Sequence, residues 1–253
     1  YYIYWHTCDV CMISANVSAF SIGKAVGRGN DVPMSWQYSG TSFSVAGQEN
    51  YPGGIIWDGT YFWVLSFIFG DVYKYNSAGV YQGVTFSVSG QDTQPQGITW
   101  DGTYLWVVGL QTDAVYKYNT SGVYQSVSFS VASQDTQPSD ITWDGTSFWV
   151  LGFTTDTVYK YNSAGVYQGV SFSVTSQEPQ PYGITWDGTS FWVVGHTNDT
   201  AYEYNADGVY QSVSFSVASQ ETTPSGITWD GTSLWVVGYA ADAVFKYSYL
   251  PTP

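Results

Sequence analysis

Ten acidic residues recur at two positions of the sequence where carboxylates could bind a cation or a polar ligand. The first set is Glu49, Asp92, Asp135, Glu178 and Glu221, and the second set is Asp71, Asp113, Asp156, Asp199 and Asp242. Carboxylates are the ligands that Ca²⁺ prefers, so a calcium site at the first set is one interpretation. The other interpretation is local, because acidic side chains in turns accept hydrogen bonds from nearby amides. We expect no cofactor, with calcium as the alternative.

A variable, mostly aromatic position lies between the two acidic sets. It holds Phe67, Leu110, Phe153, His196 and Tyr239. A flat ring stacks on the C–H face of a sugar while carboxylates and amides bind its hydroxyls. We therefore predict ligand binding by Phe67, Phe153, His196, Tyr239 and the second acidic set. Five copies would make the protein multivalent, which raises avidity. The alternative is that these side chains cover joints between structural units.

The sequence contains few residues suited to catalysis. An acid, a base and a nucleophile play unlike roles, so a catalytic site needs residues that break a repeat. Asp140 replaces a glycine, and the fourth copy contains His196, Asn198, Glu203 and Asp207. However, Glu203 occupies a position that holds lysine in the other copies. No Ser-His-Asp set or phosphate-binding loop is evident, so we predict no catalytic residues and no enzymatic activity.

The two cysteines, Cys8 and Cys11, form a Cys-x-x-Cys pair with His6 just before it. A structural zinc site needs four ligands, and no further cysteine follows. We interpret the pair as local, without a metal.

A repeat of 43 residues positions all the other candidates. The motif Trp-Asp-Gly-Thr begins at Trp57, Trp100, Trp143, Trp186 and Trp229, and Phe-Ser-Val begins at Phe43, Phe86, Phe129, Phe172 and Phe215. In the second copy, turn residues separate four expected strands at 97–100, 104–108, 115–118 and 123–131. The second of these strands is apolar on both faces, so its sheet must lie between two others. Four-stranded units of this length are typical of propeller blades.

The ends of the sequence indicate how the ring closes. The last copy lacks a fourth strand, and residues 38–45 match residues 81–88 in register. We predict an all-β, closed five-bladed β-propeller over residues 36–253, whose N-terminal strand completes the last blade. A linear solenoid is the alternative. Residues 1–35 belong to no repeat, and we expect this extension to dock to a partner or to another copy.

The third repeat carries a family resemblance. Its runs Phe129-Ser-Val-Ala-Ser-Gln-Asp-Thr-Gln-Pro138, Asp144-Gly-Thr, Trp149-Val-Leu-Gly152 and Val158-Tyr-Lys-Tyr161 resemble repeats of bacteriophage and marine-bacterial surface propellers. The sequence is similar, more distantly, to NHL-type repeats, and the expected blade number is that of the animal lectin tachylectin-2. The resemblance implies an extracellular or virion-surface protein that contacts other molecules.

The charge balance limits the possible partners. With 20 acids against 6 lysines and arginines, the net charge is −14, which leaves no basic face for nucleic acid. No apolar run approaches the roughly 18 residues that a membrane span requires. We predict a non-catalytic, multivalent surface-recognition module whose partner is a glycan or a cell-surface or virion protein. A structural subunit of a virion, fibre or extracellular assembly is the alternative.

Overall fold

The computed structural model describes residues 32–252. Its contacts divide the chain into two units, Tyr1–Pro33 and Met34–Pro253, and the second unit is described below. The predictions for Cys8, Cys11 and His6, and for docking by the N-terminal extension, concern residues outside the described part. In residues 32–252, no helix has the length and apolarity needed to cross a membrane.

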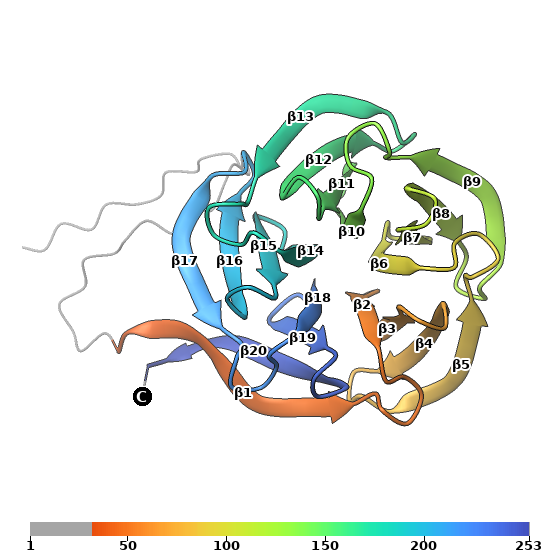
Figure 1. Ribbon diagram of the computed structural model, residues 1–253. Coiled ribbons are helices and arrows are strands. Elements are labelled where there is room, and N and C mark those ends of the chain that lie inside the picture. Colours follow the sequence, from red (N-terminus) through yellow and green to blue (C-terminus); the bar gives the residue numbers. More distant parts are fainter. Residues whose placement is uncertain (1–31, 253) are drawn as a thin grey trace, which may run out of the picture. The chain divides into compact units, whose positions relative to one another are not determined.

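Residues 34–252 form five sheets of four antiparallel strands, arranged as the blades of a propeller (Figure 1). The first two blades are β2 (Pro52–Trp57), β3 (Tyr61–Ser66), β4 (Asp71–Asn76) and β5 (Tyr81–Ser87), then β6 (Pro95–Trp100), β7 (Leu105–Gly109), β8 (Ala114–Tyr118) and β9 (Tyr124–Ser130). The next two are β10 (Pro138–Trp143), β11 (Ser147–Gly152), β12 (Thr157–Asn162) and β13 (Tyr167–Ser173), then β14 (Pro181–Trp186), β15 (Ser190–Gly195), β16 (Thr200–Asn205) and β17 (Tyr210–Ser216). The fifth is β18 (Pro224–Trp229), β19 (Leu234–Gly238), β20 (Ala243–Pro251) and β1 (Met34–Ser44). The inner strands, which surround the axis, are β2, β6, β10, β14 and β18 (Figure 1).

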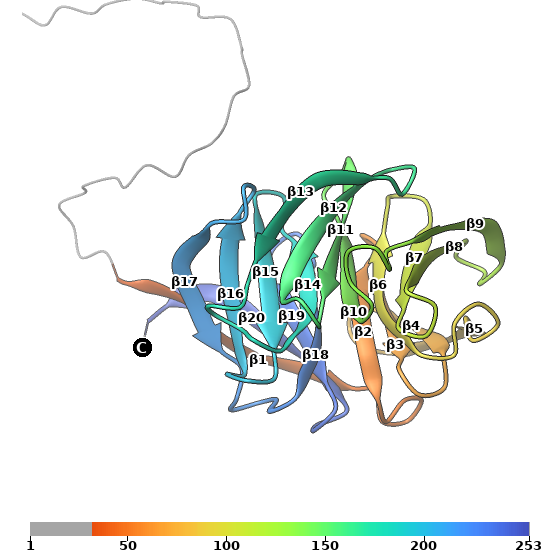
Figure 2. The ribbon, with the colours of Figure 1, turned by 45° about the horizontal axis from the view of Figure 1, so that its top comes forward.

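The ring closes through β1, as the repeat arithmetic predicts. β1 pairs antiparallel with β20, from Met34 opposite Pro251 to Ser44 opposite Ala243, and Figures 1 and 2 show it along the outer side of that strand. Trp36 of β1 packs against Trp192 of the fourth blade, with ring centroids 5.1 Å apart. The N-terminal strand therefore completes the last blade and also contacts its neighbour. The closed five-bladed propeller is confirmed.

The core lies between adjacent blades. In the cluster between the second and third blades, Trp106 and Val108 of β7 meet Ile141 of β10 and Phe148 of β11. The second strand of each blade is buried on both faces, as its apolar pattern predicts. Its tryptophan is at most 4% exposed in every blade: Trp63, Trp106, Trp149, Trp192 and Trp235.

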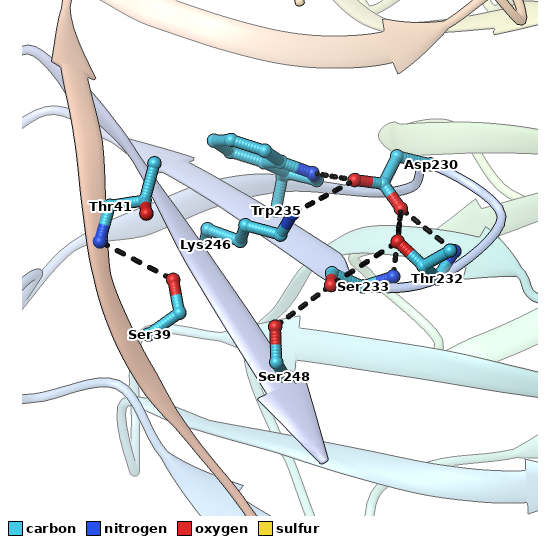
Figure 3. Close-up of polar contacts among 8 residues, drawn as sticks. All are labelled: Ser39, Thr41, Asp230, Thr232, Ser233, Trp235, Lys246 and Ser248. Atoms are coloured by element: carbon cyan, nitrogen blue, oxygen red, sulfur yellow. Dashed lines mark hydrogen bonds and ion pairs between the residues drawn. The ribbon is translucent and has the colours of Figure 1, made fainter. Parts of the chain in front are cut away.

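The aspartate of each Trp-Asp-Gly-Thr motif fixes the turn between the first two strands. In the fifth blade, one carboxylate oxygen of Asp230 accepts hydrogen bonds from the Thr232 and Ser233 amides, both at 2.8 Å. The other oxygen accepts from the Trp235 ring nitrogen and lies 3.7 Å from the Lys246 ammonium (Figure 3). Hydrogen bonds from donors lower the pKa of this carboxyl, although partial burial opposes them. The five aspartates of this motif therefore orient the core tryptophans.

Candidate functional site

The variable position predicted for ligand binding lies on the face formed by two kinds of loop. One loop leads into each inner strand, and the other joins the second and third strands of the same blade. A backbone hydrogen bond ties the two loops together: the Leu110 amide donates to the Gln94 carbonyl at 2.9 Å, and the Phe153 amide to the Gln137 carbonyl at 2.9 Å. The other three blades make the same bond from Phe67, His196 and Tyr239. The variable position is thus held beside the first residues of the inner strand.

These side chains converge on one cavity at the propeller axis. The cavity measures about 240 Å³ and is lined by Phe67, Gln96, Leu110, Gln137, Pro138, Ser139, Phe153, Tyr182 and Tyr239. Four of the five variable residues therefore face a single hollow. We expected one site per copy, and the geometry instead brings the copies together at one pocket.

A continuous row of rings forms one wall of the pocket and the layer directly behind it. The centroids of Phe153 and Tyr182 lie 5.2 Å apart. Tyr182 stacks on His196 at 3.7 Å, and His196 meets the edge of Tyr239 at 5.9 Å. His196 does not line the cavity but supports the two tyrosines that do. Its position in the sequence pattern predicted a ligand contact, whereas in the structure it lies behind the wall.

The second position of the inner strands supplies three further lining residues, and sequence reasoning missed it. This position holds Gly53, Gln96, Ser139, Tyr182 and Ser225. Gln96, Ser139 and Tyr182 line the cavity. The available signal was internal: the flanking proline and the following isoleucine are the same in all five copies, while this residue changes. The side chains that differ at these two positions therefore gather around the axis.

The wall is uncharged at neutral pH. Burial lowers the pKa of His196 to about 4, although the Glu221 carboxylate and a hydrogen bond with the Pro224 backbone oppose the shift. Burial raises the pKa of the Tyr182 hydroxyl, and burial and Tyr182 together raise that of Tyr239. The residues that line the cavity include no lysine, arginine, aspartate or glutamate. The pocket offers aromatic faces, amides and hydroxyls.

The first acidic set connects the two loops. Asp92 is 3% exposed, and its carboxylate accepts from the Gln94 amide at 2.7 Å and from the Thr112 amide and hydroxyl at 2.9 and 2.6 Å. Asp135, Glu178 and Glu221 make equivalent bonds across the two loops, and Glu49 accepts from the Tyr51 amide in its own loop. In residues 32–252 no group of three or more His, Cys, Asp or Glu side chains could hold a metal ion. Calcium binding stays a prediction.

The second acidic set consists of turn residues rather than pocket residues. Asp113, Asp156, Asp199 and Asp242 have φ values of 50°, 47°, 45° and 46°, in the left-handed region that aspartate tolerates better than most residues. The Asp113 carbonyl accepts from the Val131 amide at 2.7 Å, which ties the turn to the next loop. Burial raises the pKa of all four carboxyls. None of them lines the cavity.

Asp71 does not belong to this set, and its assignment to it was wrong. The residue that corresponds to Asp113 in the first repeat is Gly70, with φ of 67°. Asp71 is the first residue of β4, and its carboxylate accepts a 3.4 Å hydrogen bond from the Tyr73 hydroxyl. The first repeat places glycine at the left-handed position, so the next acid in the sequence only resembles the recurring aspartate.

Comparisons with solved structures support the fold. The chain is similar to a glutaminyl cyclase from Myxococcus xanthus, with a TM-score of 0.68, 10% identity, and coverage of 87% of this chain and 98% of that one. It is also similar to a virginiamycin B lyase from Staphylococcus aureus (TM-score 0.52, 14% identity, 85% and 99% coverage) and to a streptogramin B lyase (TM-score 0.51, 16% identity, 87% and 74% coverage). No protein-family model matches the sequence, and neither does any curated protein.

These comparisons contradict the prediction that the protein is not an enzyme. That prediction treated the near-identical repeats as unsuited to catalysis, yet the similar structures include a cyclase and lyases. The axial pocket shows the flaw in the reasoning, because unlike residues from different copies meet there. At 10–16% identity the likeness shows the fold alone, so it assigns no reaction to this chain.

Proposed function

We propose that the propeller binds an uncharged, hydroxyl-bearing ligand, a carbohydrate, in the axial pocket. The observation that carries the proposal is the convergence of two variable positions of the repeat, the one that holds Leu110 and the one that holds Gln96, on that pocket. The buried tryptophan of the second strand and the turn aspartate, in contrast, are the same in all five copies. Variable side chains that meet in one hollow are typical of a recognition site on a repeated scaffold.

The composition of the pocket suits a sugar ring. Phe67, Phe153 and Tyr239 present rings that can stack on C–H groups, and Gln96 and Gln137 offer amides for hydroxyls. A cavity of about 240 Å³ is smaller than the roughly 300–1,000 Å³ of pockets for drug-sized ligands, so a single ring is the expected occupant. The net charge of −14 disfavours sialylated or sulfated ligands.

The same geometry modifies the idea of multivalence. One pocket per propeller gives one site per chain, and avidity would then require several chains or a ligand that meets several propellers. An extracellular or virion-surface location, and membership of the phage-like surface propellers, are part of this proposal. They rest on the sequence resemblance.

The test is a glycan array followed by titration of a matched set of variants. Replacing Phe67, Phe153 and Tyr239 together by alanine should abolish detectable binding of any neutral glycan that the parent retains, because each lost ring removes roughly 1–3 kcal/mol. Phe69→Ala is the control, since Phe69 lies in the same loop as Phe67, is 57% exposed and does not line the pocket. Equal binding by the triple variant and the parent would refute the pocket assignment and favour a structural subunit.

A further inference from the structure

Asp140 breaks a ring of glycines on the propeller axis. The third residue of each inner strand is Gly54, Gly97, Asp140, Gly183 or Gly226. Asp140 is 3% exposed and directly follows Ser139, which lines the pocket. A buried carboxyl at a position otherwise reserved for glycine requires a partner, because an unpaired buried acid is costly.

The partners are backbone amides from two neighbouring blades. One carboxyl oxygen accepts from the Ile141 amide of its own strand at 2.8 Å, and the other accepts from the Ile184 amide of β14 at 2.8 Å. The side chain thus receives donors from its own inner strand and from the next inner strand of the ring.

In other blades, the isoleucine amide that corresponds to Ile184 also faces the preceding inner strand. A Cβ atom built on Gly183 would lie 3.0 Å from the Ile227 amide nitrogen, and one built on Gly226 would lie 3.1 Å from that of Ile55. A Cβ on Gly54 would lie 3.2 Å from the Ile98 nitrogen. Each inner strand therefore presents an isoleucine amide to its neighbour at this level of the axis, and Asp140 is the one side chain of the ring that supplies an acceptor.

Converging amides of this kind favour an anion. Successive backbone N–H groups that point into one concavity bind negative groups in many proteins. Every hydrogen bond that the structure gives the Asp140 carboxyl comes from an N–H donor, which favours the ionised form. Burial works in the opposite direction and raises the pKa of Asp140 well above its usual range.

We propose that these amides form an anion-binding site on the axis, beneath the pocket, and that Asp140 fills it as an intramolecular ligand. The site accepts a small free carboxylate once the Asp140 side chain is removed. The proposal is independent of the carbohydrate assignment, because it concerns the amide ring and not the pocket wall.

The test is chemical rescue of Asp140→Gly, which installs the residue found in the other four repeats. At pH 8, in sodium chloride, we expect a Tm lower than that of the parent by roughly 5 °C, the shift that losing one or two buried hydrogen bonds gives in a domain of this length. Increasing sodium formate at constant ionic strength should restore part of the loss and then saturate. An unchanged Tm, or equal Tm values in formate and chloride, would overturn the proposal.

Two control variants make the result specific. Asp207→Ala removes the same charge from an exposed turn and should respond equally to the two salts. Asp140→Asn keeps the side-chain volume, so it leaves no room for formate and should not be rescued. If Asp140→Gly folds in formate but not in chloride, the proposal is supported, and failure to fold in both salts counts against it.

Discussion

The imidazole of His196 lies flat against the phenol ring of Tyr182, with centroids 3.7 Å apart and planes inclined by 15°. His196 follows β15, and Tyr182 belongs to β14, so the stack links the loop to the inner strand of the same blade. The His196 amide donates to the Gln180 carbonyl at 3.2 Å, which fixes the same two segments. This packing buries the imidazole and lowers its pKa to about 4.

The low pKa of His196 predicts a pH-dependent loss of stability that His196→Phe removes. The unfolded chain protonates this residue near pH 6.5 and the folded chain near pH 4, so protons favour the unfolded state between these values. The parent should lose stability relative to the variant as the pH falls through this window, with a slope of at most about 1.4 kcal/mol per pH unit.

Urea unfolding of the parent and of His196→Phe at several pH values between 4 and 7 measures the difference. Phenylalanine is the residue at this position in the first and third repeats, so the ring is retained. His6 is unchanged in both proteins, and the carboxylates titrate in both. A difference that does not vary with pH would contradict a buried neutral imidazole.

Trp106 is a packing residue, and Trp106→Ala should lower the free energy of unfolding by roughly 3–5 kcal/mol. Its ring is 4% exposed within the cluster between two blades, and its ring nitrogen donates to Asp101 at 2.7 Å. Trp106→Phe keeps part of the apolar contact and loses this donor, so a smaller loss of about 1–3 kcal/mol is expected. Denaturant titration checks both values. Unchanged stability in the alanine variant would show that the ring is not a core element.

Two serines occupy positions that prefer glycine. Ser126 and Ser212 have φ values of 57° and 58° in the irregular part of the outer strands, where Gly40, Gly83 and Gly169 stand in the other copies. The left-handed conformation strains a residue that carries a Cβ. Ser126→Gly should therefore stabilise the protein by about 0.5 kcal/mol, after the greater flexibility of glycine in the unfolded chain is subtracted. Ser128→Gly is the control in the same strand and should destabilise, because Ser128 is not among the residues with positive φ.

Removing residues 1–46 should leave the edge of β20 unpaired and cause aggregation or strand exchange. β1 forms the pairs between Phe43 and Val244 and between Trp36 and Tyr249, so its loss opens the last blade. A truncation that stops before Met34 keeps β1 and serves as the control. Size-exclusion chromatography and thermal melts compare the two. A monomeric protein with the parental Tm after the longer deletion would contradict closure by this strand.

The sequence predicted the blades well because their strands obey local rules. The expected strands 104–108 and 115–118 correspond to β7 and β8 within one residue at each end. The local interpretation of Asp92, as an acceptor for nearby amides, agrees with its bond from the Gln94 amide. Its bond from Thr112 in the other loop was not predicted. These features depend on periodicity and on turn chemistry, which a single chain records directly.

The site was harder to predict because it depends on how the five blades curve into a closed ring. How the five blades meet at the axis decides whether Leu110 and Phe153 lie in separate sites or in one. The 43-residue period does not give the distance between these two side chains. Gln96 and Tyr182 lie in strands whose pattern indicates packing, so their place in the pocket was missed. Asp140 stood out in the sequence only as a residue that breaks the repeat, and its amide partners in two neighbouring blades follow from the closed ring.

The pairing of β1 with β20 also sets the order in which the molecule can fold. Phe43 of β1 pairs with Val244 of β20, about 200 residues later in the chain. The other outer strands pair with the strand immediately before them in the sequence. Closing so long a loop carries the largest entropic cost of any contact in the ring, and contacts of such sequence separation slow folding. We expect four blades to form while β1 is still unpaired. During synthesis β1 stays exposed until β20 has left the ribosome. Formation of the last blade then limits the rate of folding. Until it forms, a chaperone or a second chain can bind the unpaired β1.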